Sequence, residues 1–198
     1  MSDLSDVSAA LVTLIAATLY PNGTGQPSVA VVPCVVYAGW PIPQQLDADL
    51  LAGKIHVSVF PTTTERNTTR YPMTDWQTMP GNKLSREIRR QERLYMVTVW
   101  ADTPAHRDVV AQAIDPVLAV TQFLTMPDGF GARLVYHNTR IIDDHQKSKL
   151  YRRDLNYSVE YATTETVTAT PIVEVNLGLS AQVAGTNVPI STITTVIR

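Results

Sequence analysis

Large and polar side chains alternate along one stretch in the last third of the chain. The large residues are Tyr151, Arg153, Leu155, Tyr157, Val159 and Tyr161. The residues between them are Arg152, Asp154, Asn156, Ser158 and Glu160. Because successive side chains of a β-strand point to opposite faces, this period of two predicts a strand with one face on a core. A fold for this chain must therefore contain a sheet.

Near the N-terminus the apolar period changes to that of a helix. The apolar residues, spaced three and four positions apart, are Leu4, Val7, Leu11, Leu14, Ile15 and Leu19. This spacing places them on one face and predicts a helix over about residues 5–20. Ser5 is a candidate N-cap, and Pro21 is expected to end the helix.

Two further helices are predicted from their ends. Thr103 is a suitable N-cap and is followed by Pro104, which is favourable at the first helical position. The expected buried face of this helix is Val109, Val110, Ala113, Ile114, Val117, Leu118 and Leu124. Pro116 is expected to kink it or to begin a new segment. A short helix over Gln44–Leu51 is predicted because Gly53 stands where a left-handed C-terminal cap is needed.

β-branched and alternating runs predict the remaining strands. They cover residues 29–38, 54–60, 86–101 and 133–142. Pro33 interrupts the first of these, so a bulge or a position at the sheet edge is expected there. The order of helices and strands predicts an α+β domain, a largely antiparallel sheet with helices packed on one side.

Two segments have a different composition. Residues 61–83 are rich in Thr, Asn, Pro and Gly, and we expect a long loop there. Residues 171–198 carry little charge and two β-capable runs, Ile172–Leu179 and Val188–Ile197. We expect residues 1–170 to form the domain and residues 171–198 to form a β-rich extension. That extension is either a hairpin lying on the domain or a C-terminal arm that adds its strand to a neighbour's sheet, and we favour the C-terminal arm.

Composition excludes several functional classes. The chain has 198 residues and a formal net charge of -2, whereas a general nucleic-acid binder needs a dense basic face. Charged residues make up 17% of it, below the roughly 25% typical of soluble domains, which suggests that other subunits cover part of its surface. We find no signal peptide and no apolar run long enough to span a membrane, so we expect a soluble protein made in the cytoplasm.

No motif predicts an active site, a metal or a cofactor. His56, His106, His137 and His145 lack the three- or four-residue spacing of ligands on a helix. The turn Asp143-Asp144-His145 could hold a metal, but polar residues between strands ordinarily face water, and we favour that interpretation. Cys34 lies in an apolar run that should raise its pKa, which disfavours a nucleophile. Neither a P-loop nor a Gly-x-Ser-x-Gly elbow is present.

Candidate contact residues lie in a basic stretch and at two tryptophans. The basic residues that we expect to contact a partner are Arg86, Arg89, Arg90 and Arg93. The alternative is a solvated hairpin tip, which is the commoner use of exposed charge. Trp40, Tyr71 and Trp76 lie near turn residues, where aromatic side chains often anchor interfaces. For the tryptophans, a lid over the sheet is an equally acceptable interpretation.

Several phrases of the sequence resemble a known family. They are Tyr37-Ala38-Gly39-Trp40-Pro41, residues 53–61, Val99-Trp100-Ala101, residues 150–155 and residues 159–164. Across about residues 5–168 the chain resembles the tail-terminator or tail-completion (neck) proteins of tailed bacteriophages. The resemblance implies a non-enzymatic virion protein that forms a homo-oligomeric ring, typically of six copies, at the neck. Such a ring contacts the tail tube protein and the head-tail connector, and genomic DNA passes through its lumen.

Two other functions stay open at this point. A head-closure or connector-adaptor subunit would bind the portal side instead of the tube. A small cytoplasmic enzyme or ligand-binding module would use a pocket beneath residues 61–83, although the sequence offers no paired acid and base for it.

Overall fold

The computed structural model describes residues 3–69, 75–143 and 150–169. Its elements are α1 (Leu4–Leu19), β1 (Cys34–Ala38), α2 (Pro43–Leu51), β2 (Ile55–Asn67), β3 (Gln77–Met79), β4 (Lys83–Ala101), α3 (Pro104–Val120), β5 (Phe123–Thr125), β6 (Gly131–Ile142) and β7 (Tyr151–Thr168). The strands form one sheet in the order β1-β2-β4-β7-β6-β5, with β3 paired to β4. All of these pairs are antiparallel except β1 with β2. The predicted α+β class is confirmed.

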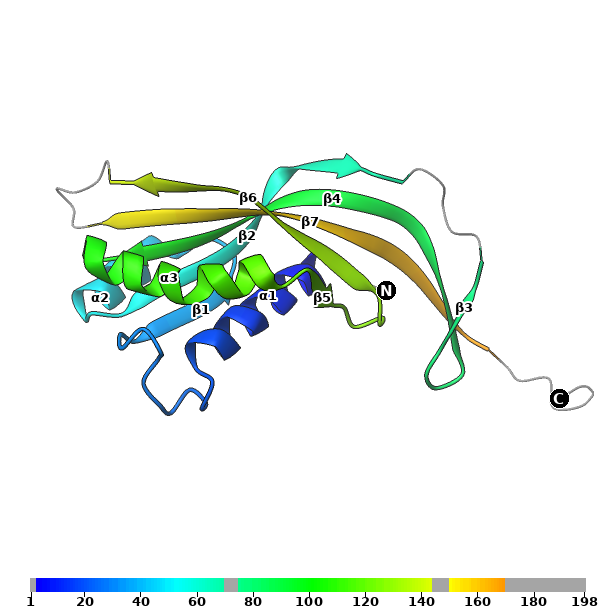
Figure 1. The fold of residues 1–198 in the computed structure, drawn as a ribbon, viewed down its shortest axis with the longest axis horizontal. Helices are drawn as coiled ribbons and strands as arrows, with labels where there is room; N and C mark the ends of the chain where they lie inside the picture. Colours follow the sequence, from blue (N-terminus) through cyan, green and yellow to red (C-terminus); the bar gives the residue numbers. More distant parts are fainter. Residues whose placement is uncertain (1–2, 70–74, 144–149, 170–198) are drawn as a thin grey trace, which may run out of the picture.

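α1 and α3 lie along one side of the sheet, as predicted (Figure 1). Strand residues on that side are buried and apolar, among them Val57, Val97, Leu155 and Tyr157. They pack on Leu11 and Ile15 of α1 and on Ile114 and Leu118 of α3. The prediction is wrong for α2, whose Asp49 and Leu46 lie against His56 and Trp100 on the other face. None of the described helices is both long enough and apolar enough to cross a membrane.

The helix ends agree with the predictions except at the first cap. Asp3, rather than Ser5, is the N-cap of α1, and its side chain and that of Asp6 form a reciprocal capping box. A carboxylate caps a helix as well as a hydroxyl does. Asp3 is favoured over Ser5 because Asp6, three residues further on, bonds back to the Asp3 amide. Thr103 caps α3 as predicted, and its side chain accepts from the His106 amide at 3.2 Å. Gly53 follows α2 at φ +75.

α3 continues through Pro116 to Val120, so of the two outcomes expected at Pro116 a new segment does not occur. Two other details of the helix and strand predictions were wrong. Leu124 is buried from β5 and not from α3, while Val109 is 44% exposed. The strand predicted over residues 29–38 begins only at Cys34, directly after Pro33, although it lies at the sheet edge as expected.

The predicted long loop over residues 61–83 is largely strand. β2 continues to Asn67 and pairs with β4 after a bulge between Pro61 and Glu65, and β3 occupies Gln77–Met79. The last residues of β2 are exposed to water. This half of the strand therefore needs no alternation of apolar residues, and its composition resembles that of a loop. Residues 70–74 and 170–198 lie outside the described residues, and so does the predicted extension at 171–198.

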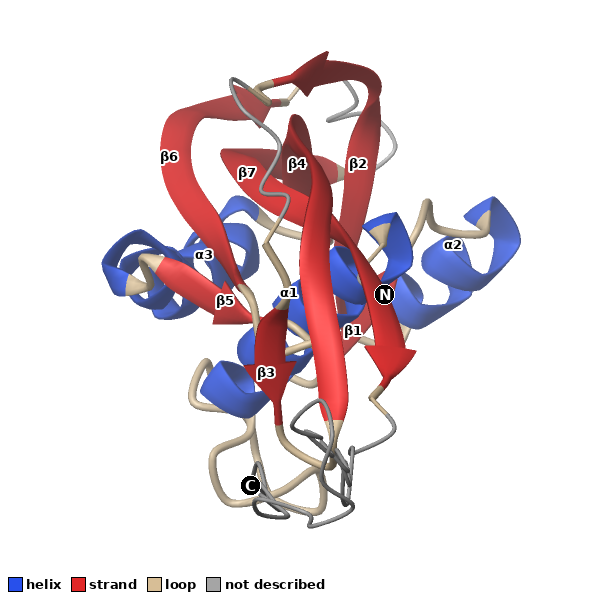
Figure 2. Ribbon diagram, turned by 90° about the vertical axis from the view of Figure 1, so that its right-hand side faces the viewer, coloured by secondary structure: helices blue, strands red, loops and turns tan. Residues whose placement is uncertain are grey.

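β4 and β7 continue far beyond the helices as a curved pair, with β3 beside them (Figures 1 and 2). We call Lys83–Glu92, Glu160–Thr168 and β3 the arm. The arm projects from the body, but it is more than a solvated hairpin tip, since Ser85, Glu87 and Gln91 are buried. A bulge between Glu87 and Arg89 leaves Ile88 49% exposed.

Candidate functional site

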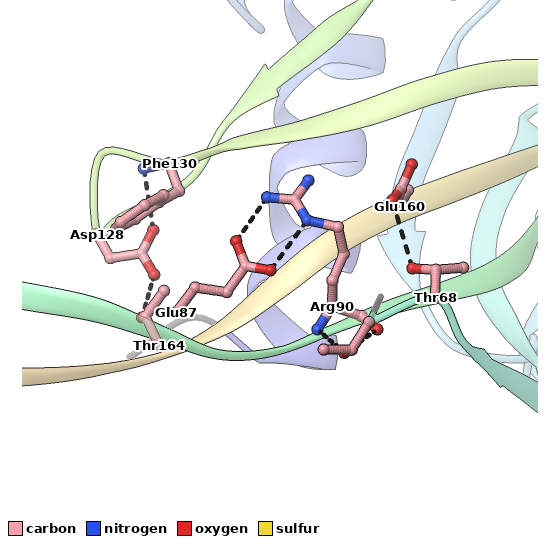
Figure 3. A network of polar contacts seen from close by, with 8 residues as sticks. Thr68, Glu87, Arg90, Asp128, Phe130, Glu160 and Thr164 are labelled. Atoms are coloured by element: carbon pink, nitrogen blue, oxygen red, sulfur yellow. Dashed lines mark hydrogen bonds and ion pairs between the residues drawn. The ribbon is translucent and has the colours of Figure 1, made fainter. Parts of the chain in front are cut away.

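The turn between β5 and β6 holds the arm against the body. Asp128 accepts hydrogen bonds from the Thr164 hydroxyl on the arm and from the Phe130 amide at 3.2 Å (Figure 3). Gly129 beside it has φ +81, and a Cβ there would lie 2.5 Å from Cε of Met79 on β3. The direction of the arm is thus fixed by contacts with a turn far away in sequence.

Removing the Asp128 carboxylate should loosen this attachment. Asp128→Ala is expected to lower the free energy of unfolding by about 1–2 kcal/mol, because the buried Thr164 hydroxyl loses a charged acceptor. Urea unfolding of Asp128→Ala, Thr164→Val and the double variant measures the coupling of the two side chains. We expect the double variant to lose about 1 kcal/mol less than the two single losses together. Strictly additive losses would mean that the contact contributes nothing.

A polar hollow of about 480 Å³ lies at the base of the arm. Glu87, Arg90, Glu92 and Glu160 of its lining have partners within the chain. Arg90 donates to both carboxylate oxygens of Glu87, at 3.0 and 2.6 Å (Figure 3). Glu87 is the main cause that holds the pKa of Arg90 above its usual value. Glu160 accepts from Thr68 at 3.3 Å. This arrangement stabilises the junction of the strands and does not place an acid opposite a free base.

Three of the four arginines of the basic stretch are paired with carboxylates within the chain. Arg86 pairs with Glu165 at 2.7 Å and lies 4.7 Å from the ring centre of Trp76. Arg93 pairs with Glu65 from the neighbouring strand. Arg89 donates to the Thr163 hydroxyl at 3.3 Å, and Arg90 pairs with Glu87 as above. Arg86, Arg89 and Arg93 hold adjacent strands together, whereas the Arg90 pair lies within β4. Any contact with a partner would be made by their remaining donors.

The structure therefore places the candidate contact residues in two regions. Arg86, Arg89 and Arg90 lie on the arm, and Arg93 lies where the arm joins the body. Trp76 directly precedes β3 and packs on Arg86. Trp40 lies at the other end of the molecule, after β1. Tyr71 lies outside the described residues.

Trp40 is both a lid and an exposed surface. Its ring packs edge-on against Phe60 and Trp100, at centroid distances of 4.7 and 5.3 Å, on the sheet side opposite α1 and α3. It nevertheless remains 55% exposed. The Arg152 guanidinium lies 4.8 Å from the Trp100 ring centre and 5.3 Å from that of Trp40. The two interpretations of Trp40 are therefore compatible.

Beneath Trp40, the sheet face opposite α1 and α3 carries a row of buried polar side chains. Ser58, Thr98 and Asp154 lie opposite one another on β2, β4 and β7, and each is at most 2% exposed. Asp154 accepts from Thr98 at 2.8 Å and from Arg152 Nε at 2.7 Å. Trp100 donates its indole N–H to Ser58 at 2.9 Å. These bonds satisfy the row and hold Arg152 in place below Trp40.

Two adjoining hollows form a groove along α2, which we call the α2 groove. Their volumes are about 300 and 680 Å³, and they share Asp47 and Leu150. The lining residues are Trp40, Pro41, Pro43, Leu46, Asp47, Leu50, Leu51, Trp100, Asp102, Thr103, Ile142, Leu150, Tyr151 and Arg152. The groove combines a mostly apolar lining with few charges, which is the usual composition of a binding site for an apolar partner. Sequence reasoning missed every lining residue except Trp40.

The most catalysis-like arrangement joins Tyr37, His56 and Asp49. His56 is buried between the Tyr37 hydroxyl at Nδ1 and the Asp49 carboxylate at Nε2, each 3.1 Å away. Burial, with a smaller effect of Asp49, raises the pKa of Tyr37 to about 12, so a phenolate nucleophile is not available near neutral pH. Lys54 is the main cause that holds the pKa of Asp49 below its usual value. The arrangement ties α2 to β1 and β2.

Metal-binding geometry is not found in the described part of the chain, where no three His, Cys, Asp or Glu side chains gather closely enough. Asp143, from the acidic turn noted in the sequence, pairs with Arg107, which is 4% exposed. Asp108 pairs with the same arginine, which is the main cause of its lowered pKa. Asp144 and His145 lie outside the described residues.

Cys34 is half-buried, and desolvation raises its pKa to about 11, in the direction predicted. At pH 8 about a hundredfold less thiolate is present than for a thiol with the ordinary pKa near 9. Alkylation by iodoacetamide should therefore be at least about a hundredfold slower than for a small free thiol. The rate should rise about tenfold per pH unit up to about pH 11. A rate that levels off near pH 8 would contradict this environment.

The chain is similar in fold to a solved structure. No protein-family model matches the chain, and no curated protein matches it. Among solved structures it is similar to the sheath/tube terminator of an extracellular contractile injection system, PVC, in its extended state, with 15% sequence identity and a TM-score of 0.48. The match covers 94% of this chain and 66% of that one.

Proposed function

We propose that this chain is a structural subunit of a tailed-phage neck, assembling head to tail into a closed ring of its own copies. In this role the ring ends the tail tube, joins it to the head connector and lets DNA pass through its lumen. Six copies are the number implied by the sequence resemblance, and the subunit would be part of the virion. The role requires neither a cofactor nor an active site.

One observation carries the proposal: the two ends of the molecule differ. A long arm projects from one end, and α2 lies at the other (Figure 1). The apolar α2 groove runs beside that helix. Contacts between unlike surfaces repeat from copy to copy, and they form a ring when the rotation between copies closes. An arm at one end and a receiving surface at the other provide such a pair.

The charge distribution supports brief contact with DNA rather than firm binding. The net charge is -2, and the arginines of the basic stretch have acidic or hydroxyl partners within the chain. Three of the four arginines of this stretch are paired with carboxylates, which leaves the stretch little excess positive charge to displace counterions from phosphates, the main source of affinity for DNA. A lumen lined by such a subunit would not retain the genome as it passes.

Addition of the purified chain to polymerising tube protein tests the role. We expect tube growth to stop, and electron microscopy should show a ring of this chain at one tube end. Binding to the portal or connector without any effect on the tube would favour the head-closure alternative. If the chain binds neither partner, the assignment to the neck is wrong.

A further inference from the structure

The α2 groove exposes more apolar side chain than a monomer needs. Trp40 is 55% exposed, Ile42 62% and Leu51 88%, and all three lie along α2 or just before it. Exposed apolar side chains that gather around a hollow are typical of a surface that a partner covers. The covering partner should itself be apolar, because Asp47, Asp102 and Arg152 are the only charged residues of the lining.

A segment of the same chain has the matching chemistry. Within Pro171–Leu179, Val173, Val175, Leu177 and Leu179 occupy alternate positions, and Glu174 is the only charged residue. An extended segment of this kind presents one continuous apolar edge to a surface. With a single charge, little desolvation opposes its burial.

The segment starts far from the groove of its own chain. Arg152, which lines the groove, and Thr168, where β7 ends, are sixteen residues apart on one strand, a path of about 50 Å. The eleven residues from Ala169 to Leu179 span at most about 40 Å when fully extended. Figure 1 shows β7 leading away from α2 toward the opposite end of the molecule. The segment starts beyond its own groove, close to where a head-to-tail neighbour would lie.

We propose that Ile172–Leu179 of one copy binds in the α2 groove of the next copy around the ring. This inference rests on the proposed ring and identifies its receiving surface. The apolar edge of the segment covers Trp40, Leu46 and Leu51 of the neighbour. Repeated around the ring, this contact links each copy to the next.

Disulfide cross-linking tests the contact in the full-length chain. In a Cys34→Ala background, Leu51→Cys and Leu177→Cys are introduced together, and the protein is oxidised mildly after assembly. Because Leu51 is 88% exposed, its substitution should not disturb folding. We expect a ladder of covalent oligomers on a non-reducing gel, since each copy links to two neighbours.

Matched variants separate the possible outcomes. Each single-cysteine variant can form dimers at most, and Val120→Cys with Leu177→Cys places the partner thiol on an equally exposed site of α3, outside the groove lining. We expect at least tenfold less ladder from that control. A disulfide within one chain would overturn the inference. Light scattering before oxidation distinguishes the remaining cases: rings without cross-links overturn only the groove contact, and strict monomers overturn the ring as well.

Discussion

Deletion of residues 171–198 is expected to convert the assembled protein into monomers. The apolar segment from Val173 to Leu179 lies within the deleted part, and its burial in the α2 groove of a neighbour would be lost at every contact of the ring. We expect the dissociation constant between copies to rise at least about a hundredfold, equivalent to about 2.7 kcal/mol per contact. Light scattering over a range of concentrations measures this change.

The same deletion should leave the fold almost unchanged. The described core is formed by α1, α3 and the body of the sheet, all within residues 3–169. Leu177→Asp, which places a charge within the proposed contact, should dissociate the ring in the same way. The free energies of unfolding in urea of the two dissociated chains should therefore agree within about 0.5 kcal/mol. Ser191→Asp, a charge added outside the proposed contact, is the matched control and should still assemble. A ring that survives deletion of residues 171–198 would refute the exchange of this segment.

Tyr157→Ala should be the most destabilising single substitution in the sheet. Tyr157 is fully buried, packs edge-on against Tyr136 and donates its hydroxyl to Asp115 of α3 at 2.7 Å. Truncation of a buried aromatic side chain costs about 3–5 kcal/mol, a large part of the 5–15 kcal/mol that stabilises a typical domain. Urea unfolding monitored by circular dichroism measures the loss.

Tyr157→Phe is the matched control for the hydroxyl alone. It keeps the ring in the core and removes one hydrogen bond to a carboxylate, so about 1–2 kcal/mol should be lost. Burial of Tyr157, together with the Asp115 contact, raises its pKa well above that of a free tyrosine. Equal losses from the two variants would mean that the ring contributes nothing, which its burial contradicts.

The sequence predicted those parts of the fold in which periodicity reports burial. Leu11 and Ile15 in α1, and Leu155 and Tyr157 in β7, face the core as their spacing indicates. The distal half of β2 has no such signal, since its outer side chains face water and its threonines are equally compatible with a loop. The first N-cap was misplaced because Asp3 and Ser5 are both competent caps.

The candidate site could be predicted only in fragments. Trp40 stood out because it lies between Gly39 and Pro41, yet the α2 groove also needs Leu46, Trp100 and Arg152 from other elements. Only the register of the sheet brings those residues together. The same holds for the basic stretch, whose partners Glu65 and Glu165 lie on neighbouring strands.

Native mass spectrometry of the purified full-length chain tests most directly whether this protein forms a closed ring of its own copies. The account predicts one dominant species at a fixed multiple of the 21.8 kDa subunit mass, with six copies expected, that stays the same size as concentration rises. A monomer at every concentration, or an open series that grows without limit, would contradict it.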